Sequence, residues 1–300
     1  MEKLSMNRKR NLGRLASLAV ALAALVVITA CGGGGSAEGG GGGGDLLQEV
    51  KDRGTLRVST DPVYRPQSFQ TSSGEFKGFD IDVTEEIAKR MGVDVEWIVP
   101  SWDVITAGSW NGRWDLSVGS MTITPERSKV LHFSPPYYYT PAAAAVHESN
   151  TDITDVETDL DGKTIGVCSA CTYEFYLDGT LNIPGNYDFV IDNPQIKTYD
   201  TDSSAVQDLA LGDGVRLDAA MSALTTLEEA KDKGTPIKIV GDPLYYEPLA
   251  VAIDKESPAN PKPLVKEVSK IVEEMHKDGT LTELSEKWYD GIDLTKKQGA

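Results

Sequence analysis

Apolar residues in the first half of the chain form an alternating series of strand-like and helix-like runs. Strands are expected at residues 56–60, 95–99 and 116–119, and helices at 80–91 and 101–110. In the first helix Ile81, Ile87 and Met91 fall largely on one face, and Gly92 is placed to end it. A strand–helix–strand order of this kind predicts a mostly parallel sheet with helices on both faces.

The second half of the chain repeats this order and then returns to helix. Strands are expected at 163–168, 196–199, 217–222 and 237–240, with helices that begin at Thr172, span 203–211 and end at Lys231. The chain enters this series through residues 140–148 and leaves it through 244–254, two extended segments flanked by prolines. Two final helices carry Leu264 and Leu281 on their apolar faces, and Gly279 is placed to end the first of them.

Residues 45–300 are too many for one ordinary domain, so two lobes are expected. Two chain crossings between the lobes would make a hinge. We therefore predict an α/β fold in which each lobe is a mostly parallel sheet flanked by helices. Lobe 1 would comprise residues 45–141 and 249–300, and lobe 2 would comprise residues 142–248.

The first 30 residues have the features of a secretory signal peptide. A basic start, from Lys3 to Arg14, precedes an uncharged apolar run over 15–30. A membrane-spanning helix needs about 20 apolar residues, so this shorter run is more typical of a signal-peptide core. The run ends in Ile-Thr-Ala-Cys31, which resembles a lipoprotein cleavage box in which the cysteine is lipid-modified. A plain secretory signal with an incidental cysteine is the alternative.

Residues 31–44 would then be a lipidated Cys31 followed by a glycine-rich tether. Ten of the 13 residues from 32 to 44 are glycine, and such a segment cannot bury a core. Its end-to-end distance as a flexible chain is roughly 20 Å. A globular domain would be held just off a membrane surface.

The chain beyond residue 30 is strongly acidic, with 24 basic and 45 acidic residues and a net charge of −21. This balance argues against a nucleic-acid partner. It indicates little about a small ligand, because an acidic surface mainly keeps a protein soluble.

Cys168 and Cys171 remain as an even pair once Cys31 is lipidated. In an exported protein such a pair is expected to form a disulfide. A zinc half-site and a redox Cys-x-x-Cys centre are the alternatives. The three histidines show no metal-ligand spacing, so no metal or cofactor is expected.

A segment suited to holding a carboxylate lies between Asp115 and Tyr137. Its strand should end near Ser120, where hydroxyl and backbone N–H groups of Ser120 and Thr122 can converge. Arg127 follows, and a guanidinium matches a carboxylate in two parallel hydrogen bonds. From the residues alone, a surface Arg127 paired with Glu126 or a neighbouring acid is the alternative.

Two stretches of this segment, Gly119-Ser-Met-Thr-Ile-Thr-Pro-Glu-Arg127 and Phe133-Ser-Pro-Pro-Tyr137, resemble the signature of a known family. It is the polar amino-acid family of bacterial extracellular solute-binding proteins, the receptors of ABC importers. Further matches in the family's order are Gly54-Thr-Leu-Arg-Val58, Asp61-Pro-Val-Tyr64, Lys77-Gly-Phe-Asp-Ile-Asp82, Lys163-Thr-Ile-Gly-Val167 and Asp278-Gly-Thr-Leu281 with Trp288. The resemblance spans roughly residues 45–291 and implies a type II periplasmic-binding-protein fold, with two α/β lobes that close on a ligand.

The resemblance also implies a ligand site. In the family the α-carboxylate is bound by the arginine and hydroxyls of the first lobe and by helix N-terminal groups of the second. These roles fall on Ser120, Thr122 and Arg127, with Met121 between the hydroxyls and Thr172 opposite. Thr172 also opens a predicted helix after a strand, where an anion is favoured in any protein. An ordinary N-cap is the alternative for Thr172.

Tyr64 and Trp102 fall where the family places aromatic walls, and Asp61 falls where some relatives contact the ligand. The alternatives are core aromatics and a turn aspartate before Pro62. Aromatic walls beside a polar site suit a small zwitterion with an apolar or cationic stem.

One position departs from the family pattern. Where members usually carry an aspartate for the α-ammonium group, this chain has Ala223. Asp61, Glu247 or a backbone carbonyl could substitute, or the ligand could lack a free α-amino group.

The expected function is therefore that of a substrate-binding lipoprotein of an ABC importer. It would be a monomer, lipid-anchored outside the cytoplasm in the periplasm or at the cell surface, and would deliver an amino acid or related carboxylate to a membrane permease. A sensory or signalling lipoprotein and a secreted dehydratase-like enzyme of the same fold are the alternatives. No nucleophile elbow or P-loop motif supports an enzyme.

Overall fold

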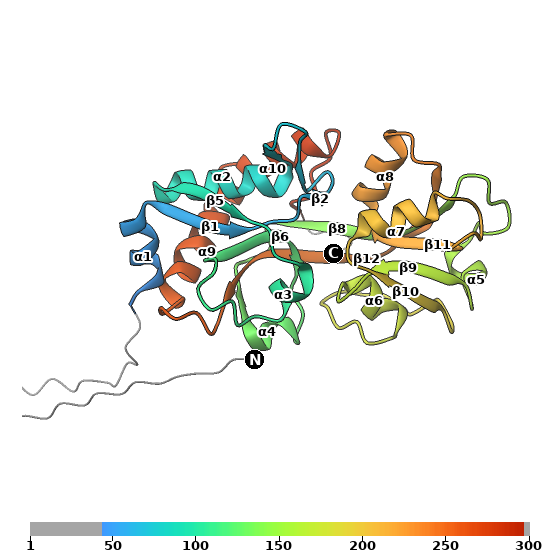
Figure 1. Cartoon of the computed structure of the whole chain (residues 1–300), viewed down its shortest axis with the longest axis horizontal. Coiled ribbons are helices and arrows are strands. Elements are labelled where there is room, and N and C mark those ends of the chain that lie inside the picture. The colour runs from blue at the N-terminus through green and yellow to red at the C-terminus, as the bar shows by residue number, and fades with distance from the viewer. Residues whose placement is uncertain (1–43, 297–300) are drawn as a thin grey trace, which may run out of the picture. The chain divides into compact units, whose positions relative to one another are not determined.

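A computed structural model describes residues 44–296, and the predicted signal peptide, Cys31 and all but the end of the glycine tether lie outside this range (Figure 1). Within it, nine strands form one long sheet. In order across the sheet they are β10 (Gln195–Tyr199), β9 (Thr164–Cys168), β11 (Ala219–Ala223), β8 (Tyr138–His147), β12 (Ile237–Asp254), β6 (Leu116–Thr122), β1 (Thr55–Ser59) and β5 (Asp94–Ile98), with β7 (Leu131–Phe133) paired to β12.

Helices cover both faces of this sheet (Figure 1). They are α1 (Leu46–Arg53), α2 (Phe79–Met91), α3 (Trp102–Thr106), α4 (Arg127–Val130), α5 (Val156–Asp159), α6 (Thr172–Leu177), α7 (Asp202–Leu209), α8 (Leu224–Asp232), α9 (Lys262–Lys277) and α10 (Thr280–Trp288). A small separate sheet contains β2 (Val63–Tyr64), β3 (Ser68–Gln70) and β4 (Phe76–Lys77). No helix among the described residues is both long and apolar enough to cross a membrane.

The outer strands of the long sheet are parallel, as predicted. β1 pairs in parallel with β5 and β6, and β9 pairs in parallel with β10 and β11. The central strands β8 and β12 are antiparallel to each other, with Thr140 opposite Glu247. They are the two predicted crossing segments. Residues 237–240, predicted as a separate strand, are the beginning of the 18-residue β12.

Side chains along β8 point alternately to the two faces of the sheet, so this strand contributes to the apolar core on both faces of the second lobe. Ala142, Ala144 and Val146 point into one buried apolar cluster with α6 residues, while Ala143 and Ala145 point into another with α7 and α8 residues. Successive side chains of a strand point to opposite faces, so one strand can serve two helix layers. The α/β two-lobe fold is confirmed.

Two clusters of buried apolar side chains form the core of the first lobe, and the smaller one contains Trp110 and Met121. Phe79, Val58 and Leu264 lie in the larger one, which joins β1 and β6 to α2 and α9. Tyr138 at the start of β8 belongs to this cluster, whereas Ala142 belongs to the second lobe. The chain changes lobes between these two residues; the predicted boundaries at 141/142 and 248/249 stay predictions.

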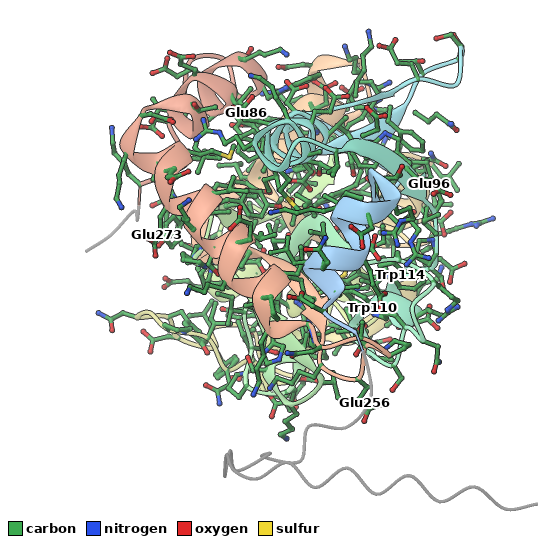
Figure 2. The ribbon with its side chains drawn as sticks, turned by 90° about the vertical axis from the view of Figure 1, so that its left-hand side faces the viewer. Glu86, Glu96, Trp110, Trp114, Glu256 and Glu273 are labelled. Atoms are coloured by element: carbon green, nitrogen blue, oxygen red, sulfur yellow. A yellow bond between two sulfur atoms is a disulfide. The ribbon has the colours of Figure 1, made fainter. Side chains whose placement is uncertain are left out.

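The helix predicted over 101–110 is wrong in its length, because α3 ends at Thr106. Gly108 and Ser109 both have positive φ, which turns the chain back and cannot continue a right-handed helix. Trp110 is then fully buried against Trp114, with ring centroids 5.1 Å apart (Figure 2). Its indole N–H donates to the carbonyl of Ile105 at 2.9 Å, so the tryptophan packs under the end of the helix it was predicted to extend.

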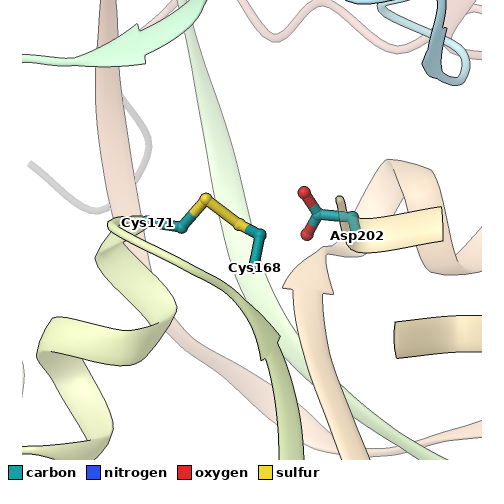
Figure 3. A group of neighbouring side chains, drawn as sticks. All are labelled: Cys168, Cys171 and Asp202. Atoms are coloured by element: carbon teal, nitrogen blue, oxygen red, sulfur yellow. A yellow bond between two sulfur atoms is a disulfide. The ribbon is translucent and has the colours of Figure 1, made fainter. Parts of the chain in front are cut away.

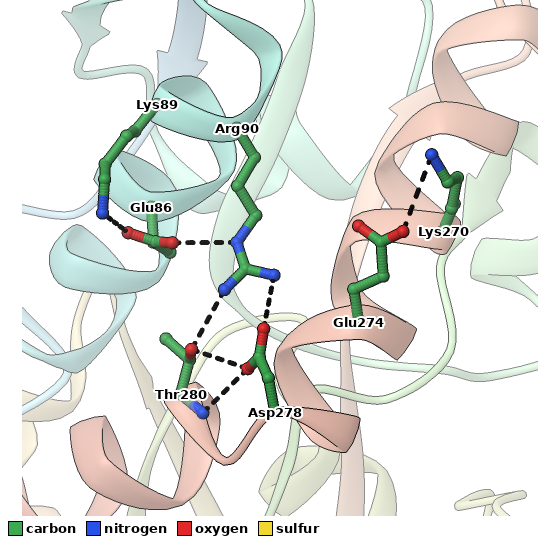
Figure 4. A network of polar contacts seen from close by, with 7 residues as sticks. All are labelled: Glu86, Lys89, Arg90, Lys270, Glu274, Asp278 and Thr280. Atoms are coloured by element: carbon green, nitrogen blue, oxygen red, sulfur yellow. Dashed lines mark hydrogen bonds and ion pairs between the residues drawn. The ribbon is translucent and has the colours of Figure 1, made fainter.

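A polar network ties α2 to the turn between α9 and α10 (Figure 4). Arg90 contacts Glu86 at 2.8 Å and Asp278 at 2.9 Å, and it donates to the Thr280 hydroxyl at 3.0 Å. This turn holds Gly279, the stop predicted from the sequence, which has φ 85°. The contact helps return the C-terminal helices to the first lobe.

Candidate functional site

A small cavity of about 50 Å³ lies where residues of both lobes face each other across the two crossing strands. Many of its lining residues lie at or just after the carboxyl ends of β1, β6, β9 and β10. Ligands of parallel α/β sheets bind at the carboxyl ends of the strands. Of the predicted site, its lining includes Asp61, Tyr64, Trp102, Ser120, Thr122, Arg127, Thr172 and Glu247. The structure therefore brings residues from distant parts of the chain to one place.

Arg127, the first residue of α4, is 5 % exposed and spans the cavity between the lobes. Its Nη1 donates to the carbonyl of Thr122 at 3.0 Å in the first lobe, and its Nη2 donates to the carbonyl of Ala170 at 2.9 Å in the second. The guanidinium lies over the Trp102 ring, 5.2 Å from its centroid. Burial lowers the pKa of Arg127 to about 10, so it stays charged at neutral pH.

Arg127 has donors left over. A guanidinium carries five N–H groups, and these two hydrogen bonds to carbonyls use only two of them. The predicted surface pairing of Arg127 with Glu126 is not formed, since Glu126 pairs with Lys129 at 3.6 Å. A buried guanidinium with free donors facing a cavity is suited to a carboxylate.

Glu247 on β12 is 2 % exposed and bridges the lobes. Its Oε1 accepts hydrogen bonds from the hydroxyls of Thr122, at 2.9 Å, and Thr172, and its Oε2 accepts from the hydroxyl of Tyr173 at 3.1 Å. Burial raises the pKa of Glu247, while these hydroxyls and the charge of Arg127 act in the opposite direction. An internal carboxylate thus occupies two hydroxyls that the family resemblance assigns to the ligand.

Ser120 lines the cavity, but its polar groups are already paired. Its hydroxyl donates to Asp80 at 2.8 Å and lies 2.6 Å from the Tyr138 hydroxyl, and its backbone N–H donates to the Tyr137 hydroxyl at 3.0 Å. Burial raises the pKa of Asp80 to about 7, despite hydrogen bonds from Tyr137 and Ser120. Ser120 also has φ 50°, a strained value for a residue with a side chain. In this structure it fixes the end of β6 rather than offering a free hydroxyl.

Two aromatic side chains form walls of the cavity. The indole N–H of Trp102 donates to the carbonyl of Ala170 at 3.3 Å, across the lobes. Tyr64 faces the second lobe, where burial, with the nearby charge of Asp202, holds its pKa well above the usual range. Both residues line the cavity, and Trp102 also packs against a buried apolar cluster of each lobe.

The disulfide predicted between Cys168 and Cys171 is present, and it lies beside Asp202 (Figure 3). The Sγ atoms and a carboxylate oxygen of Asp202 lie within 4.8 Å of one another, a spacing that could suit a metal. Metal binding needs thiolates, and sulfurs joined in a disulfide are not thiolates. As oxidised, this group leaves a single carboxylate and does not fit a metal site.

Asp202 was missed in the sequence analysis. It is 9 % exposed, lines the cavity at the start of α7 and accepts a hydrogen bond from the Ser222 hydroxyl at 2.6 Å. Burial raises its pKa to about 7, with Asp61 and Glu247 acting in the same direction. A signal was present, because Asp202 lies between the predicted strand 196–199 and the predicted helix 203–211, just as Thr172 lies where the chain passes from a predicted strand into a predicted helix. The other lining residues that were missed are Ser59, Thr60, Ile105, Ser117, Gly119, Tyr173, Asp200 and Thr201.

Two predicted positions lie away from the cavity lining. Met121 is fully buried and packs with Ile105, Trp110 and Leu131, because alternation on β6 points it to the face opposite Ser120 and Thr122. Ala223, at the end of β11, is also fully buried. Asp61 does line the cavity, and its carboxylate accepts from the N–H of Val63 at 2.7 Å.

Known proteins are similar to this chain in sequence over most of its length. The chain is 34% identical over 252 residues to the L-cystine-binding protein TcyJ of Escherichia coli strain K12, covering 84% of this chain and 88% of that protein. It is 32% identical over 249 residues to the probable amino-acid-binding protein YxeM of Bacillus subtilis strain 168, covering 83% and 88%.

Solved structures of amino acid-binding proteins are similar to this chain in both sequence and fold. An ancestral arginine-binding protein bound to arginine is 35% identical, with a TM-score of 0.66, and the match covers 79% of this chain and 99% of that one. The ancestral amino acid-binding protein AncCDT-1, a precursor of cyclohexadienyl dehydratase, is 32% identical with a TM-score of 0.69, covering 82% and 100%.

A family profile matches residues 56–291, which include every residue assigned above to the cavity. The chain belongs to the bacterial extracellular solute-binding proteins, family 3.

Proposed function

We propose that this protein is the substrate-binding lipoprotein of an ABC importer and captures an amino acid or a close derivative between its two lobes. The observation that carries the proposal is the buried Arg127, a cation with free N–H donors in the inter-lobe cavity. An amino acid carboxylate would use two of these donors in a bidentate hydrogen bond.

Lobe opening would admit the ligand. The contacts of Arg127 with Ala170 and of Glu247 with Thr122 join residues of different lobes, so separating the lobes would break them. A bound carboxylate would offer Arg127 and the threonine hydroxyls new acceptors in their place. Binding would then favour closure, because only the closed form brings both sets of donors to one ligand.

Relatives whose names specify cystine or arginine support an amino acid as the ligand class. Binding is proposed rather than catalysis, since relatives that match most of this chain are named as binding proteins. The ancestor of a dehydratase among the similar structures is itself described as an amino acid-binding protein.

The remaining parts of the proposal concern the whole chain. Residues 1–30 would be a signal peptide, Cys31 would carry the lipid, and the protein would act as a monomer outside the cytoplasm, next to its permease. Two or more acyl chains give stable anchoring, so Cys31→Ser should move the protein from the membrane fraction to the soluble fraction. If the variant stays with the membrane, the lipid anchor is wrong, although the ligand site can still be right.

The ligand site is tested by titration calorimetry with L-arginine, L-cystine and L-glutamine. A hydrogen bond to a charged group contributes about 1.5–3 kcal/mol, so Arg127→Ala should weaken the tightest of these ligands at least tenfold. Arg216→Ala is the control, because Arg216 is exposed and pairs with Asp208 at 3.0 Å, away from the cavity. Near-native affinity in Arg127→Ala would remove the basis of the proposal.

A further inference from the structure

The cavity contains more negative than positive side chains. Among the residues that line it, Arg127 is the one lysine or arginine, whereas the acids are Asp61, Asp200, Asp202 and Glu247. A ligand carboxylate would add a further negative charge. A buried charge without a partner is costly, so a ligand that fits here must bring positive charge with it.

Glu247 is the acid least free to bind that charge. Three hydroxyls already donate to its carboxylate, and Arg127 is near enough to favour its ionised form. A carboxylate has about four lone-pair sites, so three hydrogen bonds and a neighbouring guanidinium leave little for a ligand.

Asp202 is in the opposite situation. It is almost as deeply buried, yet the Ser222 hydroxyl, at 2.6 Å, is its side-chain donor, and none of the ion pairs among residues 44–296 includes it. Its neighbours Cys168 and Cys171 are joined in a disulfide and carry no charge (Figure 3). This carboxylate therefore keeps most of its acceptor capacity.

The place of Asp202 in the fold is informative. Its hydrogen-bond donor, Ser222, is the residue directly before Ala223 on β11. The carboxylate of Asp202 thus lies against the strand end at which the family resemblance expects an acid and this chain has a methyl group. The carboxylate of Asp202, at the start of α7, therefore lies close to the end of β11, where Ala223 provides no acid.

We propose that Asp202 is the specificity-determining residue of this cavity and binds the α-ammonium group of an amino acid ligand in place of an acid at position 223. The inference rests on the proposed function, because it places the ligand's carboxylate at Arg127. Asp61 and Asp200 are weaker choices. Asp61 belongs to the first lobe and accepts from its own turn, and Asp200 is exposed to solvent.

The test removes one of the two charges of the proposed contact at a time. The substitution Asp202→Asn removes the carboxylate of the protein, and an amine-free analogue lacks the ammonium group of the ligand. Wild type, Asp202→Asn and the control Asp232→Asn are titrated with whichever of L-arginine, L-cystine and L-glutamine binds wild type most tightly. The same proteins are titrated with the amine-free analogue, which is 5-guanidinopentanoate for arginine, 3,3′-dithiodipropionate for cystine or 4-carbamoylbutanoate for glutamine. Asp232 is exposed at the end of α8 and does not line the cavity, so Asp232→Asn reports the general effect of removing one acidic charge from the second lobe.

We expect Asp202→Asn to weaken binding of the amino acid at least tenfold and Asp232→Asn to weaken it less than threefold. Against the amine-free analogue, which wild type should bind weakly, Asp202→Asn should cause no further loss. Two results would overturn the role of Asp202 while leaving the proposed function intact. One is that both substitutions weaken binding of the amino acid equally. The other is that Asp202→Asn loses as much affinity for the amine-free analogue as for the amino acid. If wild type binds none of L-arginine, L-cystine and L-glutamine, the proposed function falls, and this inference falls with it.

Discussion

Replacement of Glu247 by alanine should both destabilise the fold and loosen the contact between the lobes. The substitution removes one acceptor shared by Thr122 on β6 and by Thr172 and Tyr173 on α6. It also leaves the buried Arg127 without its neighbouring carboxylate. Removing one partner of a buried charged group typically costs about 3–5 kcal/mol.

The three hydrogen bonds give an independent bound. At about 1.5–3 kcal/mol each for a charged acceptor, they would sum to more than this, but the freed hydroxyls can rotate toward each other or toward entering water. We therefore expect a loss of about 3–5 kcal/mol, a large part of the total stability of an ordinary domain. Glu247→Gln should cost less than half as much, because it keeps an acceptor oxygen and removes the cost of burying a charge.

Urea unfolding followed by circular dichroism measures these losses, and small-angle scattering of the folded protein should detect a larger radius of gyration for Glu247→Ala. Glu256→Ala is the control, since Glu256 is exposed (Figure 2) and should change the free energy of unfolding by no more than about 0.5 kcal/mol. A loss below about 1 kcal/mol for Glu247→Ala, with an unchanged radius of gyration, would refute this account of the inter-lobe contact.

Two further predictions concern groups outside the ligand contacts. Because burial raises the pKa of Asp80 to about 7, the folded protein binds more protons there than the unfolded chain between about pH 4 and 7, so stability should fall as pH rises through that range. In urea unfolding from pH 5 to 8, wild type should lose about 2.7 kcal/mol more than Asp80→Asn, which is about 1.36 kcal/mol for each of the two pH units between 5 and 7. Identical pH profiles would contradict this prediction. In a Cys31→Ser background, unfolded and unreduced protein should titrate no free thiol if Cys168 and Cys171 are joined in solution. Replacing both cysteines by serine should cost about 2 kcal/mol or less, because the closed loop is only four residues long, and two free thiols in the starting protein would refute the pairing.

The alternation of strands and helices could be predicted because each long element has its own period and stop. Gly92 and Gly279 lie at helix boundaries with positive φ, where the sequence analysis places them. The small sheet β2–β4 was not predicted, because strands of two or three residues are too short to show a period. The end of α3 depends on Trp110, whose burial is set by partners such as Asp254 that lie far along the chain.

In the candidate site, too, some features could be predicted from the sequence, whereas others depend on tertiary contacts. The family resemblance, together with the places of Arg127, Thr122 and Thr172 at strand or helix ends, led to the expectation that they share one cleft. The sequence could not indicate that Glu247 would take the two threonine hydroxyls, or that Ser120 would be held by Asp80, since both depend on tertiary contacts between residues 40 to 125 positions apart. Asp202 could have been found by the strand-end rule that identified Thr172.

The paired crossing strands also describe how the second lobe is joined to the first. Tyr139 of β8 lies opposite Pro248 of β12, so the chain leaves and re-enters the first lobe at neighbouring points of one antiparallel ladder. In architectural terms, the whole second lobe is an insertion into a β-hairpin. A short turn between residues 140 and 247 would close that hairpin without moving its strands, and a different insert could be grafted there. Ligand specificity could thus be exchanged between relatives by transplanting one continuous segment.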